Sequence, residues 1–280
     1  MAISKFDVTI ESGDSKRDVV FYLDRDRFTH KLMADFLQAG QLYEPKITKL
    51  LLSNLKPGDT FIDVGAHIGY FSIVAASVVG PSGRVYCFEP EPTNYKQIID
   101  HIRANGLKNV IPFHGAASEE TGVLDLFVET GNDGGHAIWD LWEGPFHAKN
   151  PAARAQIQKL PVPSVSLDDY LLGSAQPIKA IKIDVEGAEV TVLRGAQKLL
   201  RQKRVPLVVC ECHHSYLRCM GESEESLRNL MVELGYEVYG DFDEFPDLYP
   251  LAPGQRFESQ YIFNLIFARP GFLSGKAGVA

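Results

Sequence analysis

Apolar residues along the chain follow two alternating periodicities. Short runs rich in β-branched and aromatic residues, such as residues 60–65 (TFIDVG) and 84–90 (RVYCFEP), predict buried strands. Between such runs, residues 69–80 and 91–106 carry apolar residues at helical spacing and end in glycine, and Asn105-Gly106 can form a left-handed cap. This alternation of strands and helices predicts a mostly parallel sheet with helices on both faces.

The same pattern continues to the C-terminal end of the chain. No helix separates the last two predicted strands, so these two can pair antiparallel. A capping pattern marks the helix that begins near Ser166, with Asp169 three residues on. Further strands are expected over 109–117, 122–130, 178–185, 205–213, 236–242 and 260–270, and further helices over 44–59, 164–171, 188–200 and 223–235.

Two regions depart from this rhythm. Residues 1–45 form a predicted peripheral segment, with a short alternating run at 18–23 and a helix-like patch at 28–40. Residues 130–163 combine glycines, prolines, tryptophans and histidines, which predicts an insertion that serves as a lid or binding loop. We therefore expect one main domain over 46–270 that contains this insertion, followed by a tail over 271–280.

Composition narrows the class of protein. Hydrophobic residues make up 45% and charged residues 23% of the 280 residues, as is usual for a soluble globular protein. The net charge of −8 gives no electrostatic reason to bind nucleic acid or anionic membranes. No apolar run reaches the roughly 20 residues of a membrane span, and the N-terminal residues do not resemble a secretory signal. The four cysteines favour core thiols over disulfides or zinc ligands, so we expect a cytoplasmic protein.

A glycine-containing turn provides the first candidate chemistry. In residues 61–71 (FIDVGAHIGYF), Gly65 and Gly69 follow the strand-end Asp63, where ligands bind in doubly wound sheets. Glu89 ends the next strand, about 20 residues on, where an acid can accept hydrogen bonds from ribose hydroxyls. Together these features predict nucleoside binding. An NAD-dependent oxidoreductase uses similar features, although G-x-G-x-x-G is absent here.

Three segments in this order resemble the FkbM family of S-adenosylmethionine-dependent methyltransferases. They are DVGAHIGYFS, VYCFEPEP and IKIDVEGAEVTVLRGA, and the likeness runs from Tyr43–Pro45 through the VVCECH strand and more loosely beyond. The resemblance implies an α/β fold of class I methyltransferase type, Rossmann-like and doubly wound. Its seven-stranded, mostly parallel sheet ends in an antiparallel last strand. It also implies O-methylation of a hydroxyl on a small-molecule, sugar, natural-product or lipid-like acceptor.

The resemblance also assigns cofactor-binding positions. Asp63, Gly65, Ala66 and Gly69 match the loop around the methionine part of S-adenosylmethionine, and Glu89 matches the ribose-binding acid. His67 stands where many relatives carry asparagine, which puts an amide-specific contact there in question. The remaining expected cofactor residues are Glu44, Tyr70, Ala116, Ala117 and Ser118.

Catalytic candidates cluster after two later strands. Asp184 ends one strand, and Glu211 and His213 end the next and point to the same side of an extended chain. These three could hold Mg²⁺ or Mn²⁺, which would lower the pKa of the acceptor hydroxyl. Without a metal, His213 could act as the base with Asp184 as its partner. Glu186, close to the strand end, is a further catalytic candidate, with its contacts left open.

The insertion supplies candidates for the acceptor pocket. His136 and Trp139 could line such a pocket, or they could belong to a surface loop with partly buried aromatic rings. Three functions stay open at this point: an O-methyltransferase, an NAD-dependent oxidoreductase, and a non-catalytic domain that binds the cofactor. The sequence leaves the oligomeric state undecided.

Overall fold

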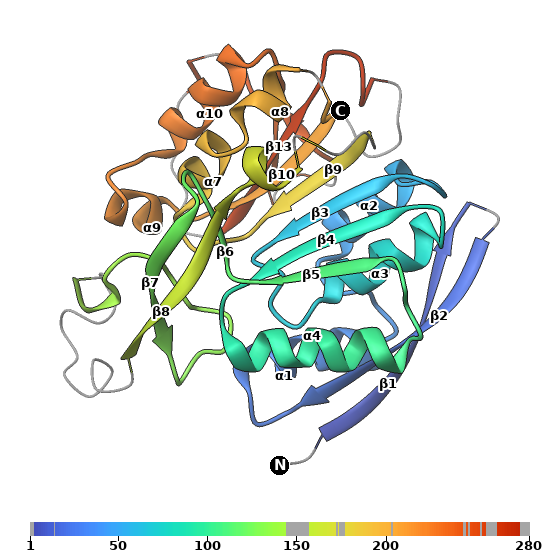
Figure 1. Cartoon of the computed structure of the whole chain (residues 1–280). Helices are drawn as coiled ribbons and strands as arrows, with labels where there is room; N and C mark the ends of the chain where they lie inside the picture. The colour runs from blue at the N-terminus through green and yellow to red at the C-terminus, as the bar shows by residue number, and fades with distance from the viewer. Residues whose placement is uncertain are drawn as a thin grey trace.

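The chain folds around one large mixed sheet. The computed structural model describes residues 3–13, 15–143, 157–171, 173, 177–202, 204–242, 245, 247–252, 254–255 and 262–274. In these residues the sheet has the order β12-β11-β13-β10-β9-β3-β4-β5 (Figure 1). Its strands are β3 (Thr60–Val64), β4 (Arg84–Glu89), β5 (Val110–His114), β9 (Ile178–Ile183), β10 (Leu207–Cys212), β11 (Glu237–Asp241), β12 (Tyr249–Pro250) and β13 (Phe263–Ala268).

This topology confirms the predicted class I methyltransferase arrangement. Strands β5, β4, β3, β9 and β10 run parallel, and β13 lies antiparallel between β10 and β11. The seven predicted strands are all present, and the two-residue β12 adds an edge strand. The order of the strands reverses between β3 and β9. Ligands bind at such a reversal in doubly wound sheets, beyond the carboxyl ends of the strands.

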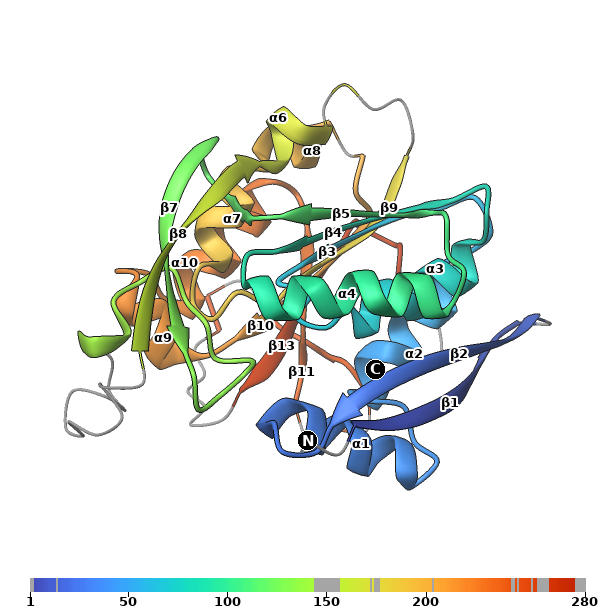
Figure 2. The ribbon, with the colours of Figure 1, turned by 60° about the horizontal axis from the view of Figure 1, so that its bottom comes forward.

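Helices cover both faces of the sheet, because alternate residues of the buried strands point to opposite sides. Phe61 belongs to one hydrophobic core and Ile62 to the other. Figure 2 shows α3 and α4 on one side of β3 to β5 and α6 and α8 on the other. The first group comprises α2 (Pro45–Asn54), α3 (Tyr70–Val79) and α4 (Pro92–Ala104); the second comprises α6 (Leu167–Leu171), α7 (Glu189–Arg194), α8 (Gln197–Arg201), α9 (His214–Cys219) and α10 (Glu224–Glu233).

Two predicted elements are shorter than expected, and glycine explains both. The helix expected over 188–200 is divided at Gly195, where a Cβ atom would lie 2.0 Å from the backbone oxygen of Ser118. The third strand ends at His114, because the chain turns at Gly115. There a Cβ atom would lie 2.6 Å from the backbone oxygen of Pro163. Residues 116–118 consequently leave the main sheet.

The N-terminal residues form a hairpin that the sequence predicted only in part. The run at 18–23 lies in β2 (Ser15–Asp24), which pairs with β1 (Ile3–Ser12), a strand that was not predicted. The predicted helical patch is α1 (Phe28–Gln38). Apolar side chains of both strands, Ile10 and Phe21 among them, are buried in the same core as α3.

Part of the expected insertion is regular. Strand β8 (Ile157–Ser166) pairs antiparallel with β7 (Gly122–Glu129) and parallel with β6 (Ala116–Ser118), forming a second, three-stranded sheet. The prediction of irregular structure up to residue 163 is therefore wrong from Ile157 on, because β7 supplies the hydrogen-bonding partners. Residues 144–156 of the insertion and 275–280 of the tail lie outside the described residues.

Two predictions from composition can be compared with the structure. The cysteines are free; Cys87, Cys210 and Cys212 are buried, which confirms the interpretation as core thiols for these three, whereas Cys219 is exposed. Across the described part of the chain, none of the helices combines the length and apolar character needed to cross a bilayer.

Candidate active site

A cavity of about 260 Å³ lies beyond the carboxyl ends of β3, β4, β9 and β10. It brings together most residues that the sequence marked as candidates. Five of the candidates do not line it: Asp63, Gly69, Ser118, Trp139 and His213. The candidates that do are Glu44, Gly65, Ala66, His67, Tyr70, Glu89, Ala116, Ala117, His136, Asp184, Glu186 and Glu211.

The glycine turn connects the ends of β3, β4 and β9. Gly65 has a φ of 75°, and a Cβ atom there would lie 1.7 Å from the backbone oxygen of Asp184. The N–H groups of Gly65 and Ala66 both donate to the oxygen of Phe88 at 3.0 Å. Only glycine permits this close approach, so residue 65 is fixed by the packing of the two strand ends. Gly69 has a φ of 83° and precedes α3 as its N-cap.

Glu89 is held by backbone donors at the wall of the cavity. Its two carboxylate oxygens accept the N–H groups of His67 and Glu91, each at 2.8 Å. Burial raises the pKa of Glu89 to about 8, although both hydrogen bonds favour the charged form. The carboxyl group is therefore fixed in place and faces the cavity where the sequence analysis expected it.

The expected adenine-side residues divide between two environments. Ala116 and Ala117 line the cavity, while Ser118 at the end of β6 does not. The backbone oxygen of Ser118 lies against Gly195 between the two short helices instead. Ser118 thus supports the bend between α7 and α8.

A buried lysine lies among the carboxylates of the opposite wall. The Lys182 ammonium contacts Asp184 Oδ2 at 2.7 Å and lies 4.5 Å from the centre of the Phe71 ring. Its side chain is only 2% exposed. Asp63 lies on the neighbouring strand in register with Lys182 and accepts the Ser72 hydroxyl at 2.6 Å. Lys182 therefore stabilises carboxylates that burial would otherwise keep protonated.

The number of carboxylates around Lys182 exceeds its single charge. Burial raises the pKa of Glu44 to about 7 and of Asp63 to about 6, with Lys182 opposing both shifts. Burial, together with Asp184 and Glu44, raises the pKa of Glu211 well above its usual range. Burial would lower the pKa of Lys182, but these acids, Asp184 foremost, raise it well above its usual value. This wall accordingly favours an added positive charge.

Glu186 projects from a strained turn between β9 and α7. Its φ is 53°, and the adjacent Gly187 has a φ of 102° and no room for a Cβ atom beside Tyr216. Burial, Asp184 and Glu189 raise the pKa of Glu186 well above its usual range. Trp139, expected in the acceptor pocket, instead donates its Nε1–H to the Glu186 backbone oxygen at 2.7 Å. Trp139 thereby supports the turn from behind.

Glu189 serves the same turn. It is the first residue of α7, and its Oε1 accepts the Gly187 N–H at 3.0 Å. Its side chain is buried and lies outside the cavity lining.

His213 lies apart from the carboxylates with which it was grouped. Strand β10 ends at Cys212, and His213 is the N-cap of α9, where its ring packs 4.2 Å from that of Tyr216. The prediction assumed that the strand continued to residue 213. Among the described residues, the ligand atoms that lie within 4.8 Å of one another at this wall belong to Glu44, Asp184 and Glu211.

The position of Glu44 beside Asp184 and Glu211 depends on a left-handed backbone conformation. It is the N-cap of α2, with a φ of 43°, and Pro45 follows it as the first helical residue. Tyr70, an expected cofactor residue, accepts the N–H of Tyr43 with its hydroxyl at 3.1 Å and so positions this segment. The buried Oε2 of Glu44 has no hydrogen-bond partner within the described structure.

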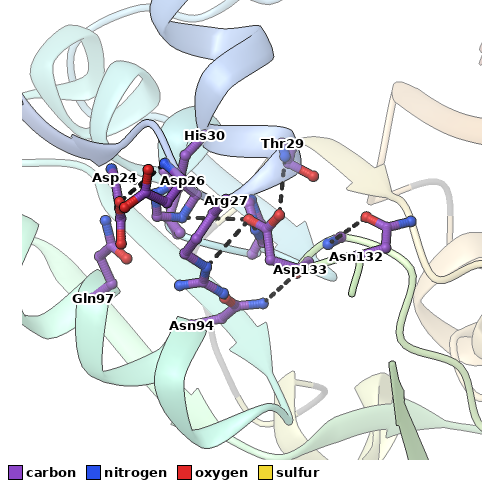
Figure 3. Close-up of polar contacts among 12 residues, drawn as sticks. Asp24, Asp26, Arg27, Thr29, His30, Asn94, Gln97, Asn132 and Asp133 are labelled. Carbon is purple, nitrogen blue, oxygen red and sulfur yellow. Dashed lines mark hydrogen bonds and ion pairs between the residues drawn. The ribbon is translucent and has the colours of Figure 1, made fainter. Parts of the chain in front are cut away.

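The opposite end of the cavity is closed by a second group of charged residues around Asp133. Its carboxylate accepts the Thr29 N–H at 2.9 Å and lies 3.1 Å from His67 Nε2 and 3.7 Å from Arg27 Nε. Its backbone oxygen accepts the amide of Asn94 at 2.9 Å, as Figure 3 shows. Asp133 therefore joins the start of α1, the glycine turn and α4.

His30, His67 and Asp133 also lie close enough to suggest a metal site, but the hydrogen bonds oppose it. His30 Nδ1 accepts the N–H of Asp24 at 3.0 Å, so the proton of the neutral ring is on Nε2. That nitrogen lies 3.4 Å from Asp133 Oδ2. His67 Nε2 is bonded to the carboxylate, and His30 Nε2 carries a proton although it forms no hydrogen bond with any described residue, so neither nitrogen offers a lone pair to a metal there. Burial lowers the pKa of His30 to about 3.

His136 lies in the cavity as a neutral ring. Its Nδ1 accepts the Glu129 N–H at 3.3 Å, and burial lowers its pKa to about 4. The ring therefore adds no positive charge to the cavity at neutral pH.

Backbone strain is concentrated in this cavity. Among the described residues, the non-glycine residues with positive φ are Glu44, His67 and Glu186, and all of them line it. Such conformations cost about 1–3 kcal/mol each and persist where the surrounding structure enforces them. The strained residues come from three separate segments and meet at one cavity, a concentration that is typical of functional sites.

Two functional residues were absent from the sequence-based candidates. Lys182 was not among the candidate site residues, although a lysine in an apolar strand beside Asp184 is a usable signal of a buried ion pair. Asp133 was not singled out, and no local pattern marks it, because its partners Thr29 and His67 lie far away in the sequence.

Comparison with known proteins agrees with this geometry. The profile described as Methyltransferase FkbM domain matches residues 63–238. Hexuronic acid methyltransferase AglP of Haloferax volcanii is 26% identical over 190 residues, which cover 67% of this chain and 70% of that protein. Protein-L-isoaspartate O-methyltransferase of Ignicoccus hospitalis is 34% identical over 67 residues, or 24% of this chain and 32% of the relative.

Among solved structures, methyltransferase FkbM from Methylobacillus flagellatus is similar with a TM-score of 0.48 and 18% sequence identity. The alignment covers 77% of this chain and 45% of that one, so this chain spans less than half the length of that protein.

Proposed function

The chain belongs to the FkbM family of S-adenosylmethionine-dependent methyltransferases, and we propose that it methylates a hydroxyl group of a small-molecule, sugar or natural-product acceptor. The observation that carries this proposal is a single cavity that contains the carboxyl group of Glu89 at one strand end and that of Asp184 at another. The relative from Haloferax volcanii is named as a methyltransferase of hexuronic acid, which supports a sugar as acceptor.

The residues present fit the cofactor. When bound, S-adenosylmethionine supplies an electrophilic methyl group on a positively charged sulfur. Carboxylates outnumber cations at the wall around Lys182, and the unpartnered Oε2 of Glu44 faces this region, which favours a cationic ligand. We assign Glu89 to the ribose hydroxyls, Gly65 to the close backbone approach, and Ala116 and Ala117 to the adenine.

Asp184 and Glu186 are the residues to which we assign the acceptor. Asp184, held by Lys182, orients the acceptor hydroxyl for in-line attack. Glu186 would take the proton of the acceptor hydroxyl, whose oxygen would receive the methyl group that S-adenosylmethionine supplies. The raised pKa of Glu186 makes its ionised form a stronger base than an ordinary carboxylate. No step is assigned to His213, because it does not line the cavity.

A metal-assisted variant is the second candidate, supported by one observation. Glu44, Asp184 and Glu211 offer carboxylate oxygens within 4.8 Å of one another, a donor set that suits Mg²⁺ or Mn²⁺. In this variant the metal would lower the pKa of the acceptor hydroxyl. Lys182 competes for the same role, because its ammonium already contacts Asp184. Full activity after exhaustive EDTA treatment would decide for the lysine.

Calorimetric titration with S-adenosylhomocysteine and, separately, NADH tests the cofactor. We expect binding of S-adenosylhomocysteine and none of NADH. The opposite result would contradict the methyltransferase function and favour an oxidoreductase.

Substitutions then separate catalysis from binding. Asp184→Asn and Glu186→Gln should leave the Kd for S-adenosylhomocysteine within about threefold and lower turnover by about 10²-fold or more, as loss of an acid–base group does. Turnover is measured as formation of S-adenosylhomocysteine with a panel of glycosides. Glu225→Gln, on the exposed face of α10, is the matched control. Unchanged turnover in Glu186→Gln would remove Glu186 from the mechanism.

A further inference from the structure

The cavity wall is unusual in its balance of charge. Five carboxyl groups line it, from Glu44, Glu89, Asp184, Glu186 and Glu211, whereas Lys182 is the sole lysine or arginine among the described lining residues. The Lys182 ammonium is 2% exposed and already contacts Asp184, so it cannot also pair with an anionic ligand. A carboxylate or phosphate of an acceptor beside Asp184, Glu186 and Glu211 would therefore meet like charges or carboxylic acids without a free cation.

The two histidines of the lining do not change this balance. His136 is neutral because burial lowers its pKa to about 4. His67 directs its Nε2 toward Asp133, outside the cavity lining. The carboxyl groups of Glu44 and Glu211 also line the cavity and can form hydrogen bonds with hydroxyl groups. Such groups suit an acceptor that presents several hydroxyls.

The mouth of the cavity has the opposite character. Three lining residues are large and apolar yet well exposed: Phe28 at 67%, Leu32 at 44% and Ile262 at 54%. Phe28 and Leu32 lie one turn apart on α1, and Ile262 precedes β13. Exposed apolar residues scattered singly need no explanation, but three around one cavity mark a surface that binds an apolar group.

We propose that the acceptor is an amphiphile with an uncharged, hydroxyl-rich head and an apolar portion, and that acidic sugars are excluded. The head enters the carboxyl-lined depth, and the apolar portion covers Phe28, Leu32 and Ile262 at the mouth. This inference rests on the proposed methyltransferase function and adds to it the charge and polarity of the acceptor. It separates this chain from an enzyme of uronic acids.

The test uses three probes that differ by one property at a time. Octyl β-D-glucoside has an uncharged head and an apolar chain, methyl β-D-glucoside lacks the chain, and octyl β-D-glucuronide adds a carboxylate. Each is titrated calorimetrically, below its micelle concentration, into the full chain saturated with S-adenosylhomocysteine. We expect octyl glucoside to bind at least about tenfold more tightly than methyl glucoside, since burying even two methylene groups gives such a factor. It should also bind more tightly than octyl glucuronide, whose carboxylate meets the acids of the described cavity lining without a free cation.

Substitutions test which residues cause the preference for an apolar chain and the discrimination against a carboxylate. Phe28→Ser should lower the advantage of octyl over methyl glucoside several-fold, while Val123→Ser, which removes an apolar side chain that is 74% exposed outside the cavity, should not. Glu211→Gln, nearly identical in shape, should lower the discrimination against the glucuronide. Because Phe28 is exposed, its substitution leaves the core intact.

Each outcome bears on one proposal. Glucuronide binding as tight as that of octyl glucoside, equal binding of the octyl and methyl glucosides, or binding of none of the three to a protein that binds S-adenosylhomocysteine would overturn the inference. Failure to bind S-adenosylhomocysteine at all would instead contradict the proposed function.

Discussion

Two groups of charged residues, one around Asp133 and one around Lys182, lie at opposite sides of one cavity and differ in how the charge of their carboxylates is balanced. Burial would raise the pKa of Asp133, but hydrogen bonds from His67 and Thr29 and the nearby His30 hold it well below its usual range. Around Lys182, burial raises the pKa of Glu44, Asp63 and Glu211, because donors are too few. A carboxylate with all its donors maintains the fold, whereas carboxylates with too few are available to a ligand.

The two groups also differ in what they connect. Asp133 joins segments that are distant in sequence, at the start of α1, the glycine turn and α4. The residues around Lys182 come mainly from the ends of neighbouring strands of one sheet. The first group therefore closes the cavity, and the second forms its reactive wall.

Removal of Lys182 should give the largest effect. Lys182→Met leaves Asp184 and its neighbours without their buried cation, and such a loss costs about 3–5 kcal/mol of unfolding free energy. Urea denaturation followed by circular dichroism measures it. The double variant Lys182→Met/Asp184→Leu should recover part of the loss. A loss below about 1 kcal/mol would mean that the pair contributes little, against expectation for a buried pair.

Asp133→Asn should have the next largest effect. The amide keeps the shape but cannot accept on both atoms, so we expect about 1–3 kcal/mol of lost stability. We also expect a several-fold weaker Kd for S-adenosylhomocysteine, since Thr29 and His67 both line the cavity. Asp100→Asn, at an exposed ion pair on α4, is the control. If the two variants lost equal stability and bound S-adenosylhomocysteine equally well, the proposed difference between the groups around Asp133 and Lys182 would be contradicted.

The pH dependence of stability should distinguish the groups directly. Folded pKa values of about 7 for Glu44, 6 for Asp63 and 8 for Glu89 lie above their ordinary values of 3.8 to 4.5. Because the folded state holds these protons more tightly, their stabilising contribution is complete below the ordinary pKa and is lost as the pH rises through 6 to 8.

Thermal unfolding of the ligand-free protein should therefore show a Tm that falls between about pH 5 and pH 8. Glu44→Gln should reduce this slope. Asp133→Asn should lower the whole curve without changing the slope, because the contribution of Asp133 is lost only as the pH falls below its ordinary 3.8. A rising Tm over this range would show that the carboxyl groups around Lys182 are ionised without cost.

Trp139→Phe should have the smallest effect. It removes one hydrogen bond to the Glu186 backbone, a loss of about 1 kcal/mol in unfolding free energy. Binding of S-adenosylhomocysteine should be unchanged, because Trp139 does not line the cavity. A large loss of that binding would place Trp139 in the ligand site after all.

The fold and the glycine turn could be predicted from sequence because both depend on local pattern. Strand ends of a parallel sheet meet at one edge, so Gly65, Glu89 and Asp184 could be brought together without coordinates. The residues at which strands end and helices begin could not be predicted from sequence. His213 was grouped with Glu211 by two-residue alternation, but β10 ends at Cys212 and α9 begins at His214.

Contacts between segments that are distant in the sequence could not be predicted either. Asp133 lies in a stretch of glycines and polar residues, and its partner Thr29 is 104 positions away. Glu44 was assigned to the cofactor only by resemblance. Its proximity to Asp184 and Glu211 depends on a left-handed backbone conformation that no sequence pattern predicts.

That left-handed backbone at Glu44, shared by His67 and Glu186, has a consequence for anyone who redesigns this chain. Glycine adopts a positive φ without the penalty that these side chains incur, so glycine at Glu44 or Glu186 relieves strain, whereas at His67 it would also remove a donor to Asp133. A laboratory selection that rewards heat resistance alone would therefore drift toward glycine at these sites. The most thermostable descendants would then be the ones that had lost their chemistry.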